Sequence, residues 1–133
     1  MQYQRVASSN DCEGRFILLV EDNKSVSEIV KNIVSMATAY HTLHVANSVE
    51  ALQVLGHMKP DLLLLDYHLP TMSGVQLYDI VHAQDAYTNI PTIIITADTS
   101  QEVRCEVQKR QLILIIKPFR LAEFVDTLNS VLA

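Results

Sequence analysis

The stretch DLLLLDYHLP, residues 61–70, decides the fold. Its four consecutive leucines lie between two aspartates, and Pro70 and Gly74 stand in the segment that follows. Such an uninterrupted apolar run is typical of a strand that helices cover on both faces of a parallel sheet. Asp66 closes this strand, and open α/β sheets bind their ligands outside the carboxyl ends of their strands. Asp66 is therefore the first candidate functional residue.

The composition predicts one ordinary globular domain. The chain has 133 residues, of which 49% are hydrophobic and 19% charged, and its net charge is −5. An acidic chain without a basic run gives no support for direct binding to nucleic acid. No apolar run approaches the ~20 residues that span a membrane, and residues 1–14 lack the apolar core of a signal peptide. Cys12 and Cys105 fit no metal-binding spacing, which favours reduced thiols in a cytoplasmic protein over a disulfide in a secreted one.

Apolar segments that alternate with helical patterns predict a parallel sheet. Buried strands are expected at residues 15–20, 62–65 and 90–95, an edge strand at 42–45, and a fifth, core strand at 112–116. Helices are expected after each strand, the fourth of them over residues 99–110, with Asn23 capping the first and Asn47 or Ser48 the second. Met58 and Leu121 are expected to face inward, Ile29 belongs to the apolar stripe of the first helix, and Ile80 is among the apolar residues of the third. This βαβ alternation predicts one α/β domain over residues 15–133, preceded by a flexible leader at 1–14.

Polar residues stand at the carboxyl ends of four predicted strands. They are Glu21 with Asp22, Asp66, Thr96 and Lys117. If the strands are parallel neighbours, these groups converge at one edge of the sheet. Clustered carboxylates repel one another, and a hard cation such as Mg²⁺ relieves that repulsion. An ammonium and a hydroxyl supply donors to a phosphate, so the set indicates phosphoryl transfer with Asp66 as nucleophile.

These motifs resemble the receiver domain of two-component response regulators. The match consists of Glu21-Asp22, Asp66, Leu69-Pro70 with Gly74, Thr96-Ala97 and Lys117-Pro118-Phe119, in the family's order and approximate spacing over residues 15–132. The resemblance implies a flavodoxin-like, doubly wound (βα)5 fold, a three-layer sandwich with sheet order 2-1-3-4-5. It also implies a signalling domain that catalyses its own phosphorylation and dephosphorylation, not a turnover enzyme.

The resemblance further implies roles for individual residues. Asp66 would accept a phosphoryl group from a sensor histidine kinase or a phosphotransfer protein. Mg²⁺, which Mn²⁺ can replace, would be held by Glu21, Asp22, Asp66 and the backbone carbonyl of His68. Thr96, Lys117 and the backbone of Ala97 would contact the phosphoryl oxygens. The resulting conformational switch would signal to a downstream protein or a fused output domain.

The sequence departs from the family pattern near the fifth strand. Leu114 occupies the switch position that usually carries an aromatic residue, and Arg110-Gln111 replaces the usual Gly-Ala. Exposed apolar residues at 112 and 113 would form a partner surface or a homodimer interface on the face of the fourth helix, fifth strand and fifth helix. His68 and Asp98, each two residues beyond a key residue, are expected to set the lifetime of the phosphoryl group.

Three other functions compete with this interpretation. A degenerate receiver would act only as a protein-binding module, but the acids and the lysine are all retained. A small Mg²⁺-dependent aspartyl-phosphate phosphatase would usually carry an acid where His68 stands. A flavin-binding protein of similar fold would want a phosphate-binding loop after the first strand, where Glu21 and Asp22 would repel the phosphate.

Overall fold

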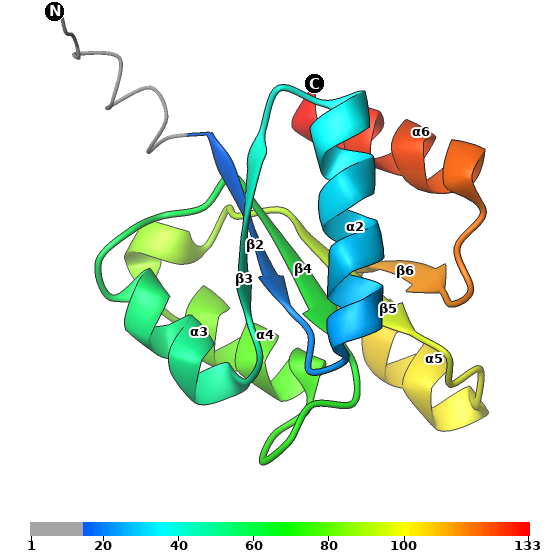
Figure 1. The fold of residues 1–133 in the computed structure, drawn as a ribbon. Helices are drawn as coiled ribbons and strands as arrows, with labels where there is room; N and C mark the ends of the chain where they lie inside the picture. Colours follow the sequence, from blue (N-terminus) through cyan, green and yellow to red (C-terminus); the bar gives the residue numbers. More distant parts are fainter. Residues whose placement is uncertain (1–14) are drawn as a thin grey trace, which may run out of the picture.

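A five-stranded parallel sheet lies between two layers of helices in the computed structural model, which describes residues 15–133 (Figure 1). The strands are β2 (Phe16–Val20), β3 (His41–Val45), β4 (Leu62–Asp66), β5 (Thr92–Thr96) and β6 (Ile113–Ile116). The helices are α2 (Lys24–Ala37), α3 (Ser48–Leu55), α4 (Gly74–His82), α5 (Gln101–Gln108) and α6 (Leu121–Leu132), with a short 3-10 helix η1 (Asp85–Tyr87). The leader expected at residues 1–14 lies outside the described residues.

The strand order is β3-β2-β4-β5-β6, and every neighbouring pair is parallel. Counted along the chain, this is the predicted order 2-1-3-4-5. The three central strands, β2, β4 and β5, are buried throughout, as expected for strands covered on both faces. None of the helices within residues 15–133 has the length and apolarity needed to cross a bilayer.

The leucine run of β4 serves two separate hydrophobic layers. Leu63 and Leu65 belong to the cluster under α3, α4 and α5, whereas Leu62 and Leu64 belong to the cluster under α2 and α6. Successive side chains of a strand point to opposite faces. Because both faces are covered, every position of the strand must be apolar until it reaches the carboxyl end.

Polar residues at the carboxyl ends of the strands also start the helices that follow. The side chains of Asn23, Asn47, Ser73 and Ser100 each accept a backbone N–H from the first turn of the next helix. Ser73 forms a full capping box with Gln76. The cap expected at Asn23 is confirmed, and of the two alternatives for the second helix the structure has Asn47. These caps fix the loops that carry the candidate site.

Several details of the expected core differ in the structure. Leu121 was expected to face the sheet and Ile29 to belong to an apolar stripe, but they are 53% and 51% exposed, and Ile80, another apolar helix residue, is 41% exposed. Met58 is 38% exposed because α3 already ends at Leu55. The fourth predicted helix is shorter than expected, since α5 covers only Gln101–Gln108.

The prediction for the fifth strand is also wrong in two respects. It begins at Ile113, not at residue 112, and it forms an edge of the sheet with partly exposed side chains instead of a core strand. Gln111, immediately before it in the turn, has φ 58°, a left-handed conformation that glycine adopts without strain. The glycine expected from the family pattern near this turn is absent, and the turn forms nevertheless.

Candidate functional site

Three carboxylates converge beyond the carboxyl ends of β2 and β4. Glu21 and Asp22 follow β2, Asp66 ends β4, and one carboxylate oxygen from each lies within 4.8 Å of the others. Glu21 is fully buried and Asp66 is 5% exposed, whereas Asp22 is exposed to solvent. The predicted convergence of these acids is therefore confirmed. Oxygen ligands gathered in this way are suited to a hard divalent cation.

Lys117 reaches the same cluster from the far edge of the sheet. Its Nζ lies 3.0 Å from Glu21 Oε1 and 3.6 Å from Asp66 Oδ2. The lysine follows β6, so its side chain crosses the end of β5 to meet the acids of β2 and β4. The backbone helps to place it, because the Lys117 N–H donates to the Thr96 carbonyl at 2.9 Å.

The protonation of Asp66 is perturbed by these surroundings. Burial raises the pKa of Asp66, and the hydrogen bond and negative charge of Glu21 raise it further. Lys117 and the backbone N–H of His68, 3.3 Å from Asp66 Oδ1, act in the opposite direction. Burial and the like charge prevail, so the pKa is about 7 instead of 3.8. Such perturbation is frequent at functional sites.

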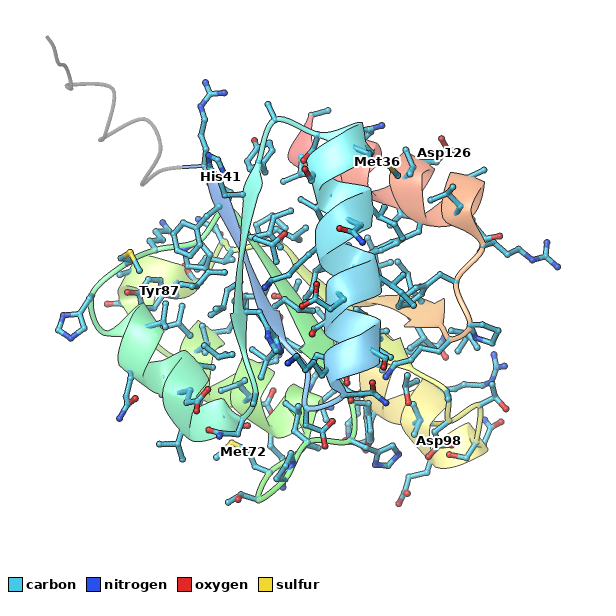
Figure 2. The ribbon with its side chains drawn as sticks, viewed as in Figure 1. Met36, His41, Met72, Tyr87, Asp98 and Asp126 are labelled. Atoms are coloured by element: carbon cyan, nitrogen blue, oxygen red, sulfur yellow. The ribbon has the colours of Figure 1, made fainter. Side chains whose placement is uncertain are left out.

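Two side chains from neighbouring loops meet beside Asp66. His68 Nε2 lies 2.7 Å from Asp98 Oδ2, and this contact joins the loop after β4 to the loop after β5. The imidazole of His68 and the N–H of Ser100 hold the pKa of Asp98 down, at about 2. Figure 2 shows Asp98 beyond the carboxyl ends of the strands, whereas His41 lies at the opposite end of the sheet. Sequence reasoning selected both residues but did not find that they bind each other.

Thr96 is the buried polar end of β5, the strand next to Asp66. It is 1% exposed, and its Oγ1 accepts the backbone N–H of Asp98 at 3.0 Å. Its oxygen is thus already used as an acceptor, which leaves the hydroxyl proton available to another group. Ala97 follows Thr96 at the same edge. Leu114, which the family resemblance makes the expected switch position, pairs in register with Ile94 and packs partly buried against the cluster under α5.

Gly74 permits a close contact that the sequence alone did not explain. A Cβ at this position would lie 2.3 Å from the backbone oxygen of Asp66. The N–H of Gly74 also donates to the Tyr67 carbonyl at 2.8 Å. The first turn of α4 is therefore packed directly on the backbone of the aspartate, and only glycine fits there.

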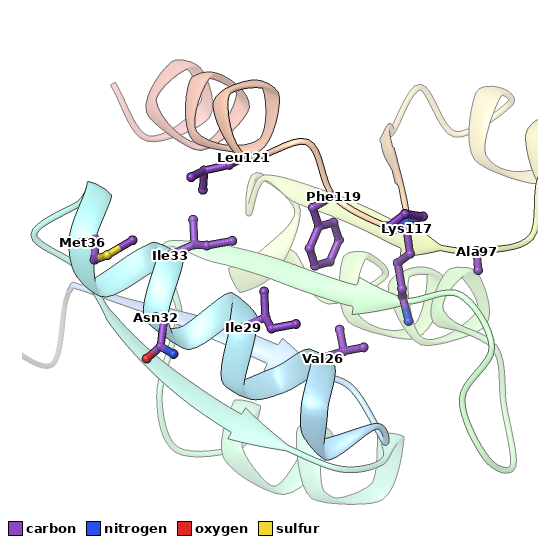
Figure 3. A pocket seen from close by; sticks show the side chains of 10 residues that line it. Val26, Ile29, Asn32, Ile33, Met36, Ala97, Lys117, Phe119 and Leu121 are labelled. Carbon is purple, nitrogen blue, oxygen red and sulfur yellow. The ribbon is translucent and has the colours of Figure 1, made fainter.

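An apolar groove that sequence reasoning missed adjoins the site. It has a volume of about 660 Å³ and lies between α2 and the segment leading into α6. Figure 3 shows Ala97 and Lys117 at one end of the groove and Met36 and Leu121 at the other, with Ile29 and Val26 along α2. Ile29 and Leu121, which are more exposed than the sequence predicted, line this groove, and their spacing in the sequence does not distinguish them from core residues.

Comparison with known proteins agrees with this geometry. The family model for the response regulator receiver domain matches residues 17–129. The polar-differentiation response regulator DivK of Brucella anthropi is 29% identical over 123 residues, which cover 87% of this chain and 94% of DivK. The chain therefore belongs to the receiver domain family of two-component response regulators.

Two solved structures are similar over nearly the whole chain. A response regulator from Chloroflexus aurantiacus superposes with a TM-score of 0.82 at 25% identity, covering 90% of this chain and 98% of that one. The receiver domain of the sensor histidine kinase PA1611 from Pseudomonas aeruginosa has a TM-score of 0.79 at 27% identity, with 90% and 98% coverage. In that protein a magnesium ion is coordinated in the active site cleft.

Proposed function

We propose that Asp66 accepts a phosphoryl group from the phosphohistidine of a sensor histidine kinase or a phosphotransfer protein. The observation that carries the proposal is the position of Asp66, buried at the meeting point of two acids and one ammonium group. A carboxylate oxygen of Asp66 attacks phosphorus and forms an O–P bond while the P–N bond of the phosphohistidine breaks. The released electron pair stays on the histidine ring nitrogen, which then takes up a proton.

The acid cluster fits a divalent cation. Glu21, Asp22, Asp66 and the backbone carbonyl of His68 would hold Mg²⁺, or Mn²⁺ in its place. Three carboxylates that lie close together support this assignment, because carboxylate oxygens are ligands for such an ion. The ammonium group of Lys117 lies beside them. When bound, the ion would neutralise charge that builds up on the phosphoryl oxygens.

The other residues position and neutralise the transferred group. Lys117 binds two acids in this structure and exchanges them for a phosphoryl oxygen. The Thr96 hydroxyl donates its free proton to a second oxygen, and the backbone N–H of Ala97 donates as well. Because Thr96 is hydrogen-bonded to the Asp98 N–H, its movement displaces the loop that starts α5. With Leu114 in place of an aromatic ring, this backbone shift carries the signal to a downstream protein or output domain.

The pair of His68 and Asp98 governs how long the phosphoryl group lasts. Their contact joins the two loops beside Asp66, where the pair would restrict the approach of water to the phosphoryl group. His68→Ala and Asp98→Ala are each expected to speed autodephosphorylation, measured by loss of the phosphorylated mass over time. An unchanged rate in both variants would remove this role and leave the rest of the proposal intact.

The chemistry is tested by incubating the protein with acetyl phosphate and Mg²⁺ and measuring its intact mass. The wild type is expected to gain the mass of one phosphoryl group, and Asp66→Asn to gain none. Asp61→Asn is the matched control, because Asp61 lies at the other end of the same leucine run. A wild type that never gains this mass would instead indicate a degenerate receiver. Continuous turnover of phosphate monoesters would indicate a phosphatase. We also place the protein in the cytoplasm, since within residues 15–133 the thiol of Cys105 is free.

A further inference from the structure

A small polar hollow lies between α2 and the outer strand β3. It has a volume of about 170 Å³ and is lined by Lys31 and Ser35 of α2 and by Tyr40, His41 and Thr42 at the amino end of β3. Figure 1 shows α2 alongside β3, which within residues 15–133 pairs only with β2. None of the five lining residues is acidic, although the chain has a net charge of −5. The hollow is therefore a locally basic place on an acidic protein.

The helix and the strand direct their polar side chains toward each other. Lys31 and Ser35 are four residues apart, so they lie on one face of α2. Leu43 packs against the cluster under α3, α4 and α5, so its neighbour Thr42 faces the other side of the sheet, where α2 lies. Tyr40 packs against the cluster under α2 and α6. Donor groups of the helix and of the strand therefore line the same hollow.

The hydroxyl of Thr42 has no hydrogen-bond partner. Its Oγ1 is one of two buried side-chain polar atoms without a partner within residues 15–133, and the other belongs to Ser48, in α3. By contrast, the nearby Thr38 hydroxyl donates to the Val34 carbonyl and accepts the Tyr40 N–H. A buried polar group without a partner destabilises a fold, and a ligand or an ordered water that completes its hydrogen bond removes that cost.

Lys31 is partly buried and lacks a carboxylate partner. In the described part of the chain, three lysine and arginine side chains are partly buried, those of Lys31, Arg110 and Lys117. The other two each bind two carboxylates, whereas Lys31 forms no ion pair within residues 15–133. A partly buried ammonium has lost some of its hydration, so an anionic partner stabilises it. The unpaired cation and the unpaired hydroxyl together point to an anionic ligand with several acceptor atoms.

We propose that this hollow binds a phosphate group, either as inorganic phosphate or as the head of a small phosphate monoester. A phosphate offers negative charge to Lys31 and acceptor oxygens to the three hydroxyls that line the hollow. The volume is below the ~300–1,000 Å³ of pockets that enclose drug-sized ligands, so the hollow encloses the anionic group alone. The site is separate from the acid cluster, because Thr42 pairs with Ile17, near the start of β2, whereas the acids follow the end of that strand. Binding here does not depend on phosphoryl transfer at Asp66.

Titration of the full chain with sodium phosphate, followed by heteronuclear NMR, tests the proposal. Divalent cations are removed beforehand on a chelating resin, and sodium chloride keeps the ionic strength constant. The backbone amides of Ser35 and Thr42 are expected to shift and to saturate. Those of Thr96 and Lys117 should stay in place, because the acid cluster repels anions when no divalent ion is bound. Saturable shifts confined to Thr96 and Lys117 would overturn the proposal.

A parallel titration with phenyl phosphate distinguishes the two sources of the phosphate group. Tighter binding of inorganic phosphate would identify the free anion as the ligand, and tighter binding of phenyl phosphate would identify a monoester. If neither compound causes saturable shifts at Ser35 and Thr42, the hollow is not a phosphate site.

A pair of lysine variants on α2 tests the charge. We expect Lys31→Gln to weaken phosphate binding about tenfold, since it removes a charge-assisted contact. Lys24→Gln is the matched control, because Lys24 is an exposed lysine of the same helix outside the hollow, and it should bind phosphate as the wild type does. An equal loss in both variants would reveal a general effect of net charge and contradict a site at Lys31.

Thr42→Val tests the hydroxyl, because it removes the unpartnered oxygen and keeps a similar shape. Without phosphate the variant should unfold at a higher temperature than the wild type, since no buried hydroxyl is left without a partner. Phosphate is expected to raise the unfolding temperature of the wild type more than that of the variant, because a ligand stabilises the state that binds it. An equal rise in the two proteins would refute the proposed site.

Discussion

Strand β4 carries an aspartate near each end, and the two carboxylates lie in opposite surroundings. Asp61, just before the strand, is partly exposed, and its Oδ2 accepts the backbone N–H of Phe16 at 2.9 Å. Asp66, at the other end, is 5% exposed and shares its space with the carboxylate of Glu21. The first aspartate satisfies a backbone donor, whereas the second is held beside a like charge.

The same contrast extends to the two ends of the whole sheet. At the amino end, Arg110 binds Asp79 through two hydrogen bonds of 2.8 and 2.7 Å, and the His82 ring contacts the Ile90 carbonyl at 2.9 Å. The Tyr87 hydroxyl donates to the Leu55 carbonyl at the same end. At the carboxyl end, buried acids repel one another. The contacts at the amino end thus stabilise the fold, whereas the acid cluster at the carboxyl end, to which we assign phosphoryl transfer, lowers its stability.

The largest expected effect comes from the close contact at the carboxyl end. Gly74→Ala would push a Cβ into the Asp66 carbonyl oxygen, 2.3 Å away, and backbone on both sides would have to move. We expect the free energy of unfolding to fall by ~3 kcal/mol, measured by urea denaturation. Gly56→Ala is the control, because its Cβ would meet nothing nearer than 3.4 Å. Equal stability of the two variants would show that α4 is not packed tightly on Asp66.

The second-largest expected effect is a gain in the free energy of unfolding. Asp66→Asn removes a buried charge beside Glu21, and we expect it to raise the free energy of unfolding at pH 7.5 without Mg²⁺ by ~2 kcal/mol. Asp61→Asn, at the other end of the strand, is expected to give no gain. A destabilised Asp66→Asn protein would contradict the contrast between the two ends.

The pH dependence of stability follows from the same residue. A carboxyl group with a raised pKa binds its proton more tightly in the folded protein than in the unfolded chain. Its contribution to stability is complete below the ordinary value of 3.8 and is lost as the pH rises through about 7. Without Mg²⁺, the wild type should therefore lose more stability than Asp66→Asn between pH 5 and 8, measured by thermal unfolding. Parallel curves for the two proteins would exclude this explanation.

A smaller loss is expected at the amino end. Arg110→Met removes the paired hydrogen bonds to Asp79 and those to Glu106 while preserving much of the side chain, which is 17% exposed. We expect the free energy of unfolding to fall by ~1 kcal/mol, with phosphorylation of Asp66 unaffected. Lys109→Met, which breaks an ion pair at a lysine 62% exposed, should cost less. Loss of phosphorylation in Arg110→Met would show that the two ends are not separate.

The smallest effect concerns the turn before β6. Gln111 has φ 58°, where a side chain is strained and glycine is not. Gln111→Gly should raise the free energy of unfolding by ~0.5 kcal/mol, because relief of strain exceeds the added freedom of the unfolded chain. Gln108→Gly, inside α5, should lower it instead. If Gln111→Gly lowered the free energy of unfolding as Gln108→Gly does, the left-handed turn would carry no strain.

Much of the fold followed from apolar patterning. The central strands could be predicted because β2, β4 and β5 are buried on both faces and contain almost no polar residue before their carboxyl ends. The acids and Lys117 could be predicted to converge because parallel strands end at one edge. The strand order itself rested on the family resemblance, since burial patterns do not say which buried strands are neighbours.

What the sequence did not show depends on contacts between distant segments. The Glu21–Lys117 ion pair joins residues 96 positions apart, and the bond between His68 and Asp98 joins two loops. The fit of Gly74 against Asp66 requires the position of a helix relative to a backbone oxygen. Leu121 was misplaced because an apolar residue at a helical margin has the same spacing whether it meets the sheet or lines a groove.

The reach of Lys117 across β5 has an electrostatic consequence. With Glu21, Asp22 and Asp66 all ionised, the single ammonium leaves the cluster two negative charges in excess, which is the charge that one divalent cation would cancel. A monovalent ion would leave one negative charge, which would repel the anionic phosphoryl donor that we propose. The charge of the cluster therefore favours a divalent over a monovalent ion at the site that we propose for phosphoryl transfer.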